Sequence, residues 1–235
     1  MPFSKREAPN CQWCPHRKNC LFDYLGTAEA RQVWKEMRVA NRFKPGESIF
    51  HEGAQPAALF VVCSGKVKIF KSGRSGQELI TRIESPGDLL GHVALLSEEG
   101  SYMGTAQALE TSTVSMVDQK NFFDFLSRFP QAARALMKEL ARDVRRGENK
   151  ARDIAFKPAR GRLADTLLRM MRSSKPHPMV AGFKRRDLAE MAGLTLETAV
   201  RLLKDFEQRS LLRKRDKDLL ILDEAKLRQL ASSSS

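Results

Sequence analysis

Hydrophobic and polar positions follow one period up to about residue 128 and a different period after it. Between residues 43 and 118, short apolar runs are separated by turns, and glycine recurs there from position 46 to position 104. In the run GKVKIFK, Val67 and Ile69 alternate with Lys66 and Lys68, which is the pattern of a half-buried strand. Many short strands joined by glycine-rich turns predict an antiparallel sandwich or barrel.

A helical pattern begins at Pro130, a residue suited to the first turn of a helix. Small and apolar residues then recur at alternating steps of four and three, which is the a/d seam of about three heptads. Such a stripe either packs on the chain's own core or joins two parallel helices, and its narrowness after a compact β unit favours the second. The predicted dimer contacts are Met137, Leu140, Val144, Ala151 and Ile154.

The segment KRRDLAEMAGLTLETAVRLLKDFEQ predicts two short helices. The first covers residues 185–192, Gly193 provides a tight break, and Thr195 caps a second helix that ends near Gln208. Ala189 lies four residues before the glycine, so the two helices can approach closely at a steep angle, as in a helix-turn-helix. The following run LLRKRDKDLLIL predicts a hairpin with a basic tip.

The outward face of the second helix carries side chains that suit DNA. Recognition helices enter the major groove with their N-terminal residues, where Arg201 can donate two hydrogen bonds to guanine and Glu197 can accept one from cytosine. Val200 can contact a thymine methyl, and the basic hairpin suits phosphate. The alternative is an ordinary helical hairpin with a solvated charged face. The predicted DNA contacts are Thr195, Glu197, Thr198, Val200, Arg201, Lys204, Lys214 and Arg215.

The distribution of charge supports the assignment of DNA binding to the C-terminal half of the chain. The net charge of the 235 residues is +13. Residues 1–128 carry 16 Lys and Arg against 14 Asp and Glu, whereas residues 129–235 carry 25 against 14. This excess predicts a polyanion binder, although charge alone leaves RNA, DNA and acidic membranes open. No apolar run approaches the ~20 residues of a membrane span, and the N-terminus has no apolar signal core, so we expect a cytoplasmic protein.

Three of the four cysteines lie in NCQWCPHRKNCLF, at Cys11, Cys14 and Cys20, with the spacing C-x2-C-x5-C. Cytoplasmic thiols stay reduced, so metal or redox chemistry accounts for this group better than disulfides. The readings are an iron–sulfur site, a Cys3His zinc site that includes His16, a thiol redox switch, or a loop without a cofactor. The fourth cysteine, Cys63, ends the apolar run LFVVC, where a small buried residue is the alternative to a ligand.

The motifs PGESIFHEG, LFVVCSGKVKIF, GDLLGHVALL and LTLETAVRLL, in this order, resemble the CRP/FNR superfamily of bacterial transcription regulators over nearly all of residues 10–230. The resemblance implies an α+β fold: an N-terminal antiparallel β-roll of the cyclic-nucleotide-binding jelly-roll kind, a long dimerisation helix and a C-terminal winged helix-turn-helix. It divides the chain into a Cys-rich sensor segment (1–25), a β-roll sensor domain (26–128), the dimerisation helix (129–156) and a DNA-binding domain (157–231). It also implies a homodimer that binds a palindromic operator in double-stranded DNA and works with RNA polymerase.

Two branches of that superfamily, the cyclic-AMP branch and the FNR branch, differ in their ligand-binding residues, and this chain can be compared with each. The cyclic-AMP branch binds its nucleotide phosphate through a Gly-Glu pair and a later Arg-Ser pair. Here Gly91 is kept, but His92 replaces the Glu, and Tyr102 and Met103 stand where Arg-Ser would fall. Without that arginine a buried phosphate lacks its charge partner, so the resemblance does not extend to cyclic-nucleotide sensing.

The FNR branch holds a 4Fe–4S cluster with a C-x2-C-x5-C group and a later cysteine. Cys11, Cys14 and Cys20 match that spacing, but Ser115 stands where the family usually has the fourth cysteine. The resemblance therefore implies a cluster whose fourth ligand is Cys63, Ser115, an aspartate such as Asp23, or a small molecule.

Together these features predict a homodimeric, sequence-specific DNA-binding regulator whose cluster, held by Cys11, Cys14, Cys20 and Cys63, senses oxygen or redox state. The alternative is a CRP/FNR-type regulator controlled by another small ligand in the β-roll, with a cysteine loop that holds zinc or is only structural. An enzyme of the cupin type is not expected, because its metal site needs several histidines on facing strands and only two of the chain's four histidines lie in the roll.

Overall fold

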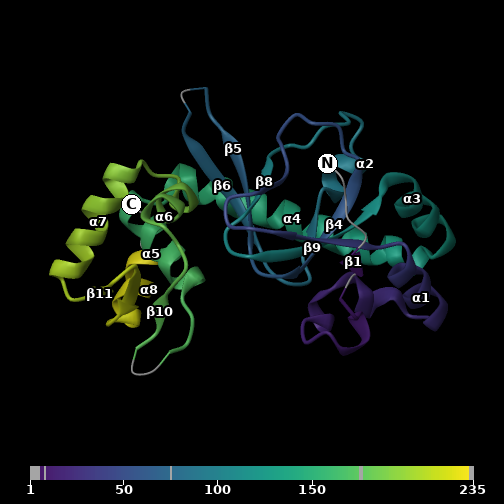
Figure 1. The fold of residues 1–235 in the computed structure, drawn as a ribbon. Helices are drawn as coiled ribbons and strands as arrows, with labels where there is room; N and C mark the ends of the chain where they lie inside the picture. Colours follow the sequence, from purple (N-terminus) through teal and green to yellow (C-terminus); the bar gives the residue numbers. More distant parts are fainter. Residues whose placement is uncertain (1–5, 8, 75, 175–176, 233–235) are drawn as a thin grey trace. The chain divides into compact units, whose positions relative to one another are not determined.

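The structure is a computed structural model that describes residues 6–7, 9–74, 76–174 and 177–232 (Figure 1). The chain separates into two compact units, one of residues 1–71 and 82–145 and one of residues 72–81 and 146–235. The finer division into four segments stays a prediction, and its first five residues lie outside the described part of the chain.

Two antiparallel sheets, whose strands lie in the first unit except for the end of β5 and the start of β6, confirm the predicted β-roll. One sheet has the strand order β1-β2-β9-β4-β7, and the other has the order β3-β8-β5-β6. Apolar side chains of both sheets share one core that includes Phe60, Val67, Ile69 and Tyr102. The strands are β1 (Arg6–Glu7), β2 (Val39–Phe43), β3 (Ser48–Phe50), β4 (Ala58–Ser64), β5 (Val67–Ser72), β6 (Glu78–Glu84), β7 (Leu89–Leu90), β8 (Thr105–Ala108) and β9 (Ser112–Asp118).

Strand β5 departs from the expected alternation at one position. Val67 and Ile69 are buried as predicted, but Lys68 is buried as well, with only 6% of its surface exposed. Its ammonium lies 4.6 Å from the centre of the Phe70 ring, so an aromatic face covers the charge that the sequence pattern placed in solvent.

Six short helices belong to the described N-terminal segment and roll. They are η1 (Cys11–Trp13), η2 (Arg17–Asn19), η3 (Leu21–Leu25), α1 (Ala28–Glu36), α2 (His92–Leu96) and α3 (Gln119–Arg128). Thr27 caps α1 by accepting a hydrogen bond from the Ala30 amide at 3.1 Å, and Asp118 caps α3 in the same way. A second core joins Cys11, Cys20 and Trp34 to residues of α3 and of the following long helix.

The long helix α4 (Pro130–Phe156) has two different apolar faces. Ala132 and Leu136 are buried in the core just described. Of the predicted seam, Leu140 is half-buried, while Met137 and Val144 leave 58% and 62% of their surfaces exposed. The seam is therefore not the face by which α4 packs on its own core.

The second unit is a winged helix-turn-helix, as the sequence predicts. Its elements are α5 (Ala159–Met170), β10 (Met179–Val180), α6 (Arg185–Ala192), α7 (Leu196–Gln208), β11 (Leu212–Arg215), β12 (Asp218–Ile221) and α8 (Glu224–Ser232). The strands pair in the order β10-β12-β11, and Leu188, Ala199 and Phe206 are fully buried between the elements. In the described part of the chain, no helix combines the length and the apolar character needed to cross a membrane.

Candidate DNA interface and cysteine site

The turn between α6 and α7 fixes the direction of the second helix. Gly193 adopts a left-handed conformation with φ 63°, and its amide donates to the carbonyls of Ala189 and Glu190 at the end of α6. Thr195 then caps α7, because its hydroxyl accepts a hydrogen bond from the Thr198 amide at 3.2 Å. The break and the cap lie at the predicted residues.

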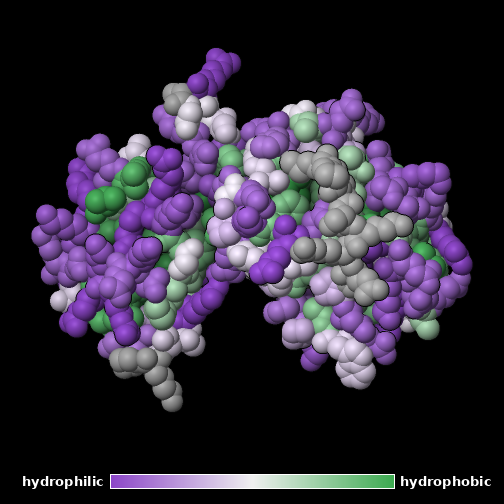
Figure 2. All heavy atoms as spheres, viewed as in Figure 1, coloured by the Kyte–Doolittle hydropathy of each residue, from purple (hydrophilic) through white to green (hydrophobic). Residues whose placement is uncertain are grey.

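The predicted base-reading residues lie together on the exposed side of α7. Glu197, Arg201 and Lys204 are exposed, and Val200 leaves 48% of its surface uncovered. Thr198 is half-buried beside them, while Ala199 and Leu203 turn into the core. In the view of Figure 2 the surface around α7 and the wing is mostly hydrophilic, in keeping with the basic charge of this half of the chain.

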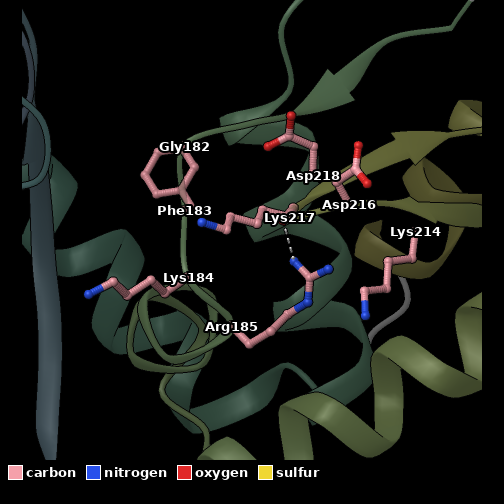
Figure 3. Close-up of a pocket in the computed structure, with 8 residues that line it drawn as sticks. All are labelled: Gly182, Phe183, Lys184, Arg185, Lys214, Asp216, Lys217 and Asp218. Atoms are coloured by element: carbon pink, nitrogen blue, oxygen red, sulfur yellow. Dashed lines mark hydrogen bonds between the residues drawn. The ribbon is translucent and has the colours of Figure 1, made fainter.

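The wing forms a second basic surface, only part of which was predicted. Lys214 and Arg215 are exposed on β11, ahead of a turn at Asp216. Beside them lies a hollow of ≈ 520 Å³. Lys184 at the start of α6 and Lys217 in the turn line the same hollow as Lys214, and in Figure 3 Lys184 and Lys214 lie on opposite sides of Arg185.

Lys184 and Arg185 were missed by the sequence interpretation, although the run FKRRD before α6 was a usable signal. Arg185 donates to the Lys217 carbonyl at 3.3 Å, which ties the first helix of the motif to the wing. The hollow is lined by Gly182, Phe183, Lys184, Arg185, Lys214, Asp216, Lys217 and Asp218.

Arg162 of α5 ties the end of α4 to the turn of the helix-turn-helix. Its guanidinium donates to the carbonyls of Ile154 and Lys157 at 3.1 Å and to the carbonyl of Ala192 at 2.9 Å. These carbonyls lie at the C-terminal ends of α4 and α6, where helices leave such groups unpaired. The Arg162 side chain thus provides hydrogen bonds for unpaired carbonyls at the ends of two helices.

The four cysteines come from two distant parts of the chain, the N-terminal segment and strand β4. Cys11 and Cys20 are buried, Cys14 and Cys63 are half-buried, and all four are free thiols. Cys11 interacts electrostatically with Cys14 and Cys63, and Cys20 interacts with Cys11 and Cys63. In Figure 1 the N-terminal coil (dark purple) lies beside β1 and α1.

Cys63 occupies a β-bulge. Along the β4–β9 pair, Val62 lies opposite Val114 and Ser64 opposite Thr113, so Cys63 is the extra residue. A bulge re-aims the side chain that it carries. The Cys63 thiol here lies 3.5 Å from the hydroxyl of Ser115, which is fully buried on the neighbouring strand. The residue that replaces the family's usual cysteine is therefore a direct neighbour of the chain's fourth cysteine.

Burial dominates the acidity of the inner thiols. It raises the pKa of Cys20 to about 12. Burial also raises the pKa of Cys11, against the opposing charge of Arg38 and with the nearby thiols Cys63 and Cys14 adding to the rise. Thiols of high pKa carry little thiolate and react slowly, so Cys11 and Cys20 are poor candidates for a free-thiol redox switch.

The donor set suits an iron–sulfur cluster better than a single ion. Among the described residues, no three His, Cys, Asp or Glu side chains are placed to hold a metal ion. Zinc needs all its sulfurs about 2.3 Å from one point, whereas a cluster takes its thiolates on separate irons and so accepts them further apart. Two buried and two half-buried thiols with a cation, Arg38, acting on Cys11 and Cys20 suit a thiolate-held cluster. Asp23, another of the candidate fourth ligands, instead pairs with Arg17 at 2.7 Å.

His92 and Tyr102, which stand in place of the phosphate-binding residues of the cyclic-AMP branch, have partners within the chain. His92 is 1% exposed, and its Nε2 lies 3.1 Å from an Asp143 carboxylate oxygen on α4. Arg82 pairs with the same carboxylate and with Glu84. The Tyr102 ring stacks on a neighbouring phenylalanine at 3.9 Å, and its hydroxyl donates to the Ala58 carbonyl. These side chains serve internal packing.

A β-roll, a long helix and a winged helix-turn-helix with an exposed basic reading face define a DNA-binding regulator. The sequence profile of the cyclic nucleotide-binding domain matches residues 40–129, and that of the Crp-like helix-turn-helix domain matches residues 161–230. The cyclic AMP receptor protein of Thermus thermophilus is 32% identical over 161 residues, which cover 68% of this chain and 73% of that protein. The chain belongs to the CRP/FNR family, whose members are transcription regulators and not enzymes.

A second relative matches a larger part of the chain than the cyclic AMP receptor protein does. The fumarate and nitrate reduction regulatory protein of Vibrio cholerae is 27% identical over 232 residues, which cover 97% of this chain and 92% of that protein. This match reaches into the cysteine segment and supports the FNR-like branch. The solved structure of FixK2 from Bradyrhizobium japonicum shares the fold with a TM-score of 0.73 at 24% identity, covering 84% of this chain and 99% of FixK2.

Proposed function

We propose that this protein is a homodimeric, sequence-specific transcription regulator that senses oxygen or redox state through a 4Fe–4S cluster held by Cys11, Cys14, Cys20 and Cys63. The observation that carries the proposal is the place of Cys63. It lies on a bulge beside Ser115 and within the electrostatic environment of Cys11 and Cys20. The ligand set is then complete, with the fourth cysteine moved to the adjacent strand.

Cluster chemistry agrees with these residues. Thiolates are the soft ligands that iron–sulfur clusters require, and the bound cluster would supply a redox centre that oxygen can destroy. Cys11 and Cys20 are buried, and limited solvent access at such a site tunes the redox potential of a bound centre. Because the inner thiols are protonated without iron, we expect loading to release protons.

The cysteine segment is packed so that its state can reach α4. Leu21, Phe22 and Leu25 share a core with Ala132 and Leu136. The Leu25 carbonyl accepts a hydrogen bond from Gln131 at 3.1 Å.

A tight turn holds the other side of the same segment. Gly87 has φ 105°, and a Cβ there would lie 2.8 Å from the Asn19 carbonyl oxygen. Loss of the cluster would thus loosen a segment that supports the base of the dimer helix. This loosening would shift the population between active and inactive states.

The exposed stripe on α4 provides the dimer contact. Met137, Val144 and Ile154 leave 39–62% of their surfaces exposed, and Leu140 and Ala151 complete the seam. Pairing two such helices would present two α7 helices to successive major grooves of a palindromic operator. Such a dimer acts on DNA in the cytoplasm, and RNA polymerase is its expected further partner.

Within the second unit, Arg162 is the residue best placed to transmit a movement at the end of α4 to the helix-turn-helix. It holds the carbonyls of Ile154 and Ala192 at once. A movement of the α4 end would therefore pull on the turn that orients α7. At the DNA, Arg201 and Glu197 would read bases with Thr195, Thr198, Val200 and Lys204 around them, while Lys214 and Arg215 contact phosphates.

Purification without oxygen tests the proposal directly. We expect about four iron and four sulfide per chain, a broad visible absorption and tight, sequence-dependent DNA binding. Exposure to air should then remove the absorption and weaken DNA binding in parallel. A colourless protein with one zinc per chain, and with a DNA affinity that air does not change, would instead identify the regulator with a structural cysteine loop and another ligand.

A further inference from the structure

Arg38 is a buried cation beside the cysteine site. It lies between α1 and β2 and leaves only 7% of its surface exposed. Its two terminal nitrogens donate to the Ser115 hydroxyl and to the Pro9 carbonyl, each at 3.4 Å. Its Nε finds no hydrogen-bond partner within the described residues. The guanidinium thus has hydrogen-bonding capacity that the protein framework does not use.

A charge buried in this way needs a counter-charge. Transfer of an ionised group from water into a protein interior is costly unless an opposite charge offsets it. Arginine cannot give up its proton to avoid that cost. In the described part of the chain, none of the hydrogen-bond partners of Arg38 is a carboxylate; they are the Ser115 hydroxyl, the Pro9 carbonyl and the Cys11 thiol.

Thiols of the proposed cluster site lie close enough to Arg38 to interact with its charge. Its charge acts on both Cys11 and Cys20. Arg38 and Cys63 also share a hydrogen-bond partner. Both donate to the Ser115 hydroxyl, and the Cys63 thiol lies 3.5 Å from it. Three of the four proposed ligands therefore lie around one guanidinium.

A cluster with four thiolates is an anion. The oxidised [4Fe–4S]2+ core with four thiolates has a net charge of −2, and one-electron reduction to [4Fe–4S]1+ makes it −3. Net charge and hydrogen bonds to the sulfurs are among the main determinants of the potential of such a centre. A fixed cation next to the sulfurs favours the more negative, reduced form and strengthens binding of both forms.

We propose that Arg38 is the counter-ion of the cluster: it offsets the negative charge of the thiolate-held core, strengthens its binding and raises its reduction potential. This inference rests on the proposed cluster function. Arg38 binds no iron, and it acts as a positioning and charge-compensating residue behind the ligands.

The test compares Arg38→Gln and Arg38→Lys with the full-length protein loaded without oxygen. Electrochemical titration gives the potential, and competition with an iron chelator gives the strength of cluster binding. We expect Arg38→Gln to have a more negative potential and to lose its cluster at about 10-fold lower chelator concentration. Arg38→Lys keeps the charge without the planar fork, so its potential should stay close to that of the parent protein.

Arg42→Gln is the matched control, because Arg42 is exposed on the adjacent strand β2 and the same charge is removed. It should leave both measurements unchanged. If Arg38→Gln has the parent's potential and chelator midpoint, the counter-ion role is wrong. It is also wrong if Arg38→Lys is as impaired as Arg38→Gln, because then the fork's contacts to Ser115 and Pro9 matter and the charge does not.

Two further readouts keep the test decisive. If Arg38→Gln binds too little cluster for its reduction potential to be measured, chelator competition of Arg38→Lys is decisive. Cluster binding close to that of the parent protein supports the charge role. Cluster binding as weak as that of Arg38→Gln overturns it. Failure of the parent protein itself to load a cluster would contradict the proposed function, and that outcome is distinct from every outcome among the Arg38 variants.

Discussion

The DNA-reading surface and the cysteine site are built in opposite ways. The reading surface comes from one continuous segment, its side chains are exposed, and its shape depends on a local turn and a local cap at Gly193 and Thr195. The cysteine site joins a loop near the N-terminus to a strand more than forty residues later, and two of its thiols are buried. The first site can change residue by residue, whereas in the second every member depends on the others.

This contrast predicts different consequences of a single substitution at the two sites. Under the proposed function, exposed residues on α7 would contribute separately to DNA affinity, because each would contact its own base or phosphate. A cluster needs all of its ligands, so the loss of one must be compensated at a neighbouring position. The pair of Ser115 and Cys63, 3.5 Å apart on adjacent strands, has the form of such a compensation.

The largest expected effect is at Cys63. Cys63→Ala should remove most of the iron and sulfide bound after anaerobic loading, because one of four ligands is missing. Ser115→Ala should keep the cluster, since the hydroxyl is only a neighbour of the ligand. Adding Ser115→Cys to Cys63→Ala should restore loading, because it returns the thiol to the adjacent strand. Iron and sulfide analysis with visible absorption measures all three.

This set of variants separates the candidate fourth ligands. Full loading of Cys63→Ala together with loss of loading in Ser115→Ala would assign the fourth position to the serine. Full loading of both would point to Asp23 or a small molecule. Either result would also weaken the view that the cysteine site is a set whose members cannot be exchanged singly.

The sequence predicts the DNA-reading surface in more detail than the cysteine site, because the first depends on local signals and the second on contacts between distant strands. The bounds of α6 and α7 follow from local signals, namely periodicity, one glycine and one N-cap, and the structure has them at those residues. The bulge at Cys63 and the burial of Arg38 depend on the pairing of β4 with β9 and on the turn before β2. No local pattern encodes either, so Cys63 was one candidate among several and Arg38 was not considered. Lys68 was misplaced for a related reason, because its cover is an aromatic ring.

Arg201→Ala should have the next largest effect. Loss of a bidentate contact to guanine costs about 1–3 kcal/mol for each half-site, and it should relax the preference at that base. Lys214→Ala should instead weaken binding to all sequences alike and lower the salt dependence by about one unit for each phosphate that the protein no longer neutralises. Binding to specific and random duplexes across a salt series distinguishes the two. An Arg201→Ala protein with full sequence preference would show that α7 is not the reading helix.

Val144→Asp tests whether the exposed stripe of α4 is a dimer contact. Val144 is 62% exposed within one chain, so its replacement should not unfold the protein. In a dimer, two buried valines contribute about 3 kcal/mol together, so their removal should raise the dissociation constant roughly a hundredfold. Sedimentation measures it. Asn149→Asp adds the same charge at an exposed position off the stripe and should leave the dimer intact. Equal dimers in both variants would exclude the stripe as the contact.

Thr195→Ala should have the smallest effect and isolates the local character of the reading surface. It removes the hydroxyl that accepts from the Thr198 amide, and loss of an N-cap costs about 1 kcal/mol. Urea unfolding should show this loss, while Thr195→Ser, which keeps the hydroxyl, should match the parent. Cluster content should be equal in both variants, because the cap lies outside the unit that holds the cysteines. A Thr195→Ala protein with reduced iron would show that the two sites are coupled even in the absence of DNA.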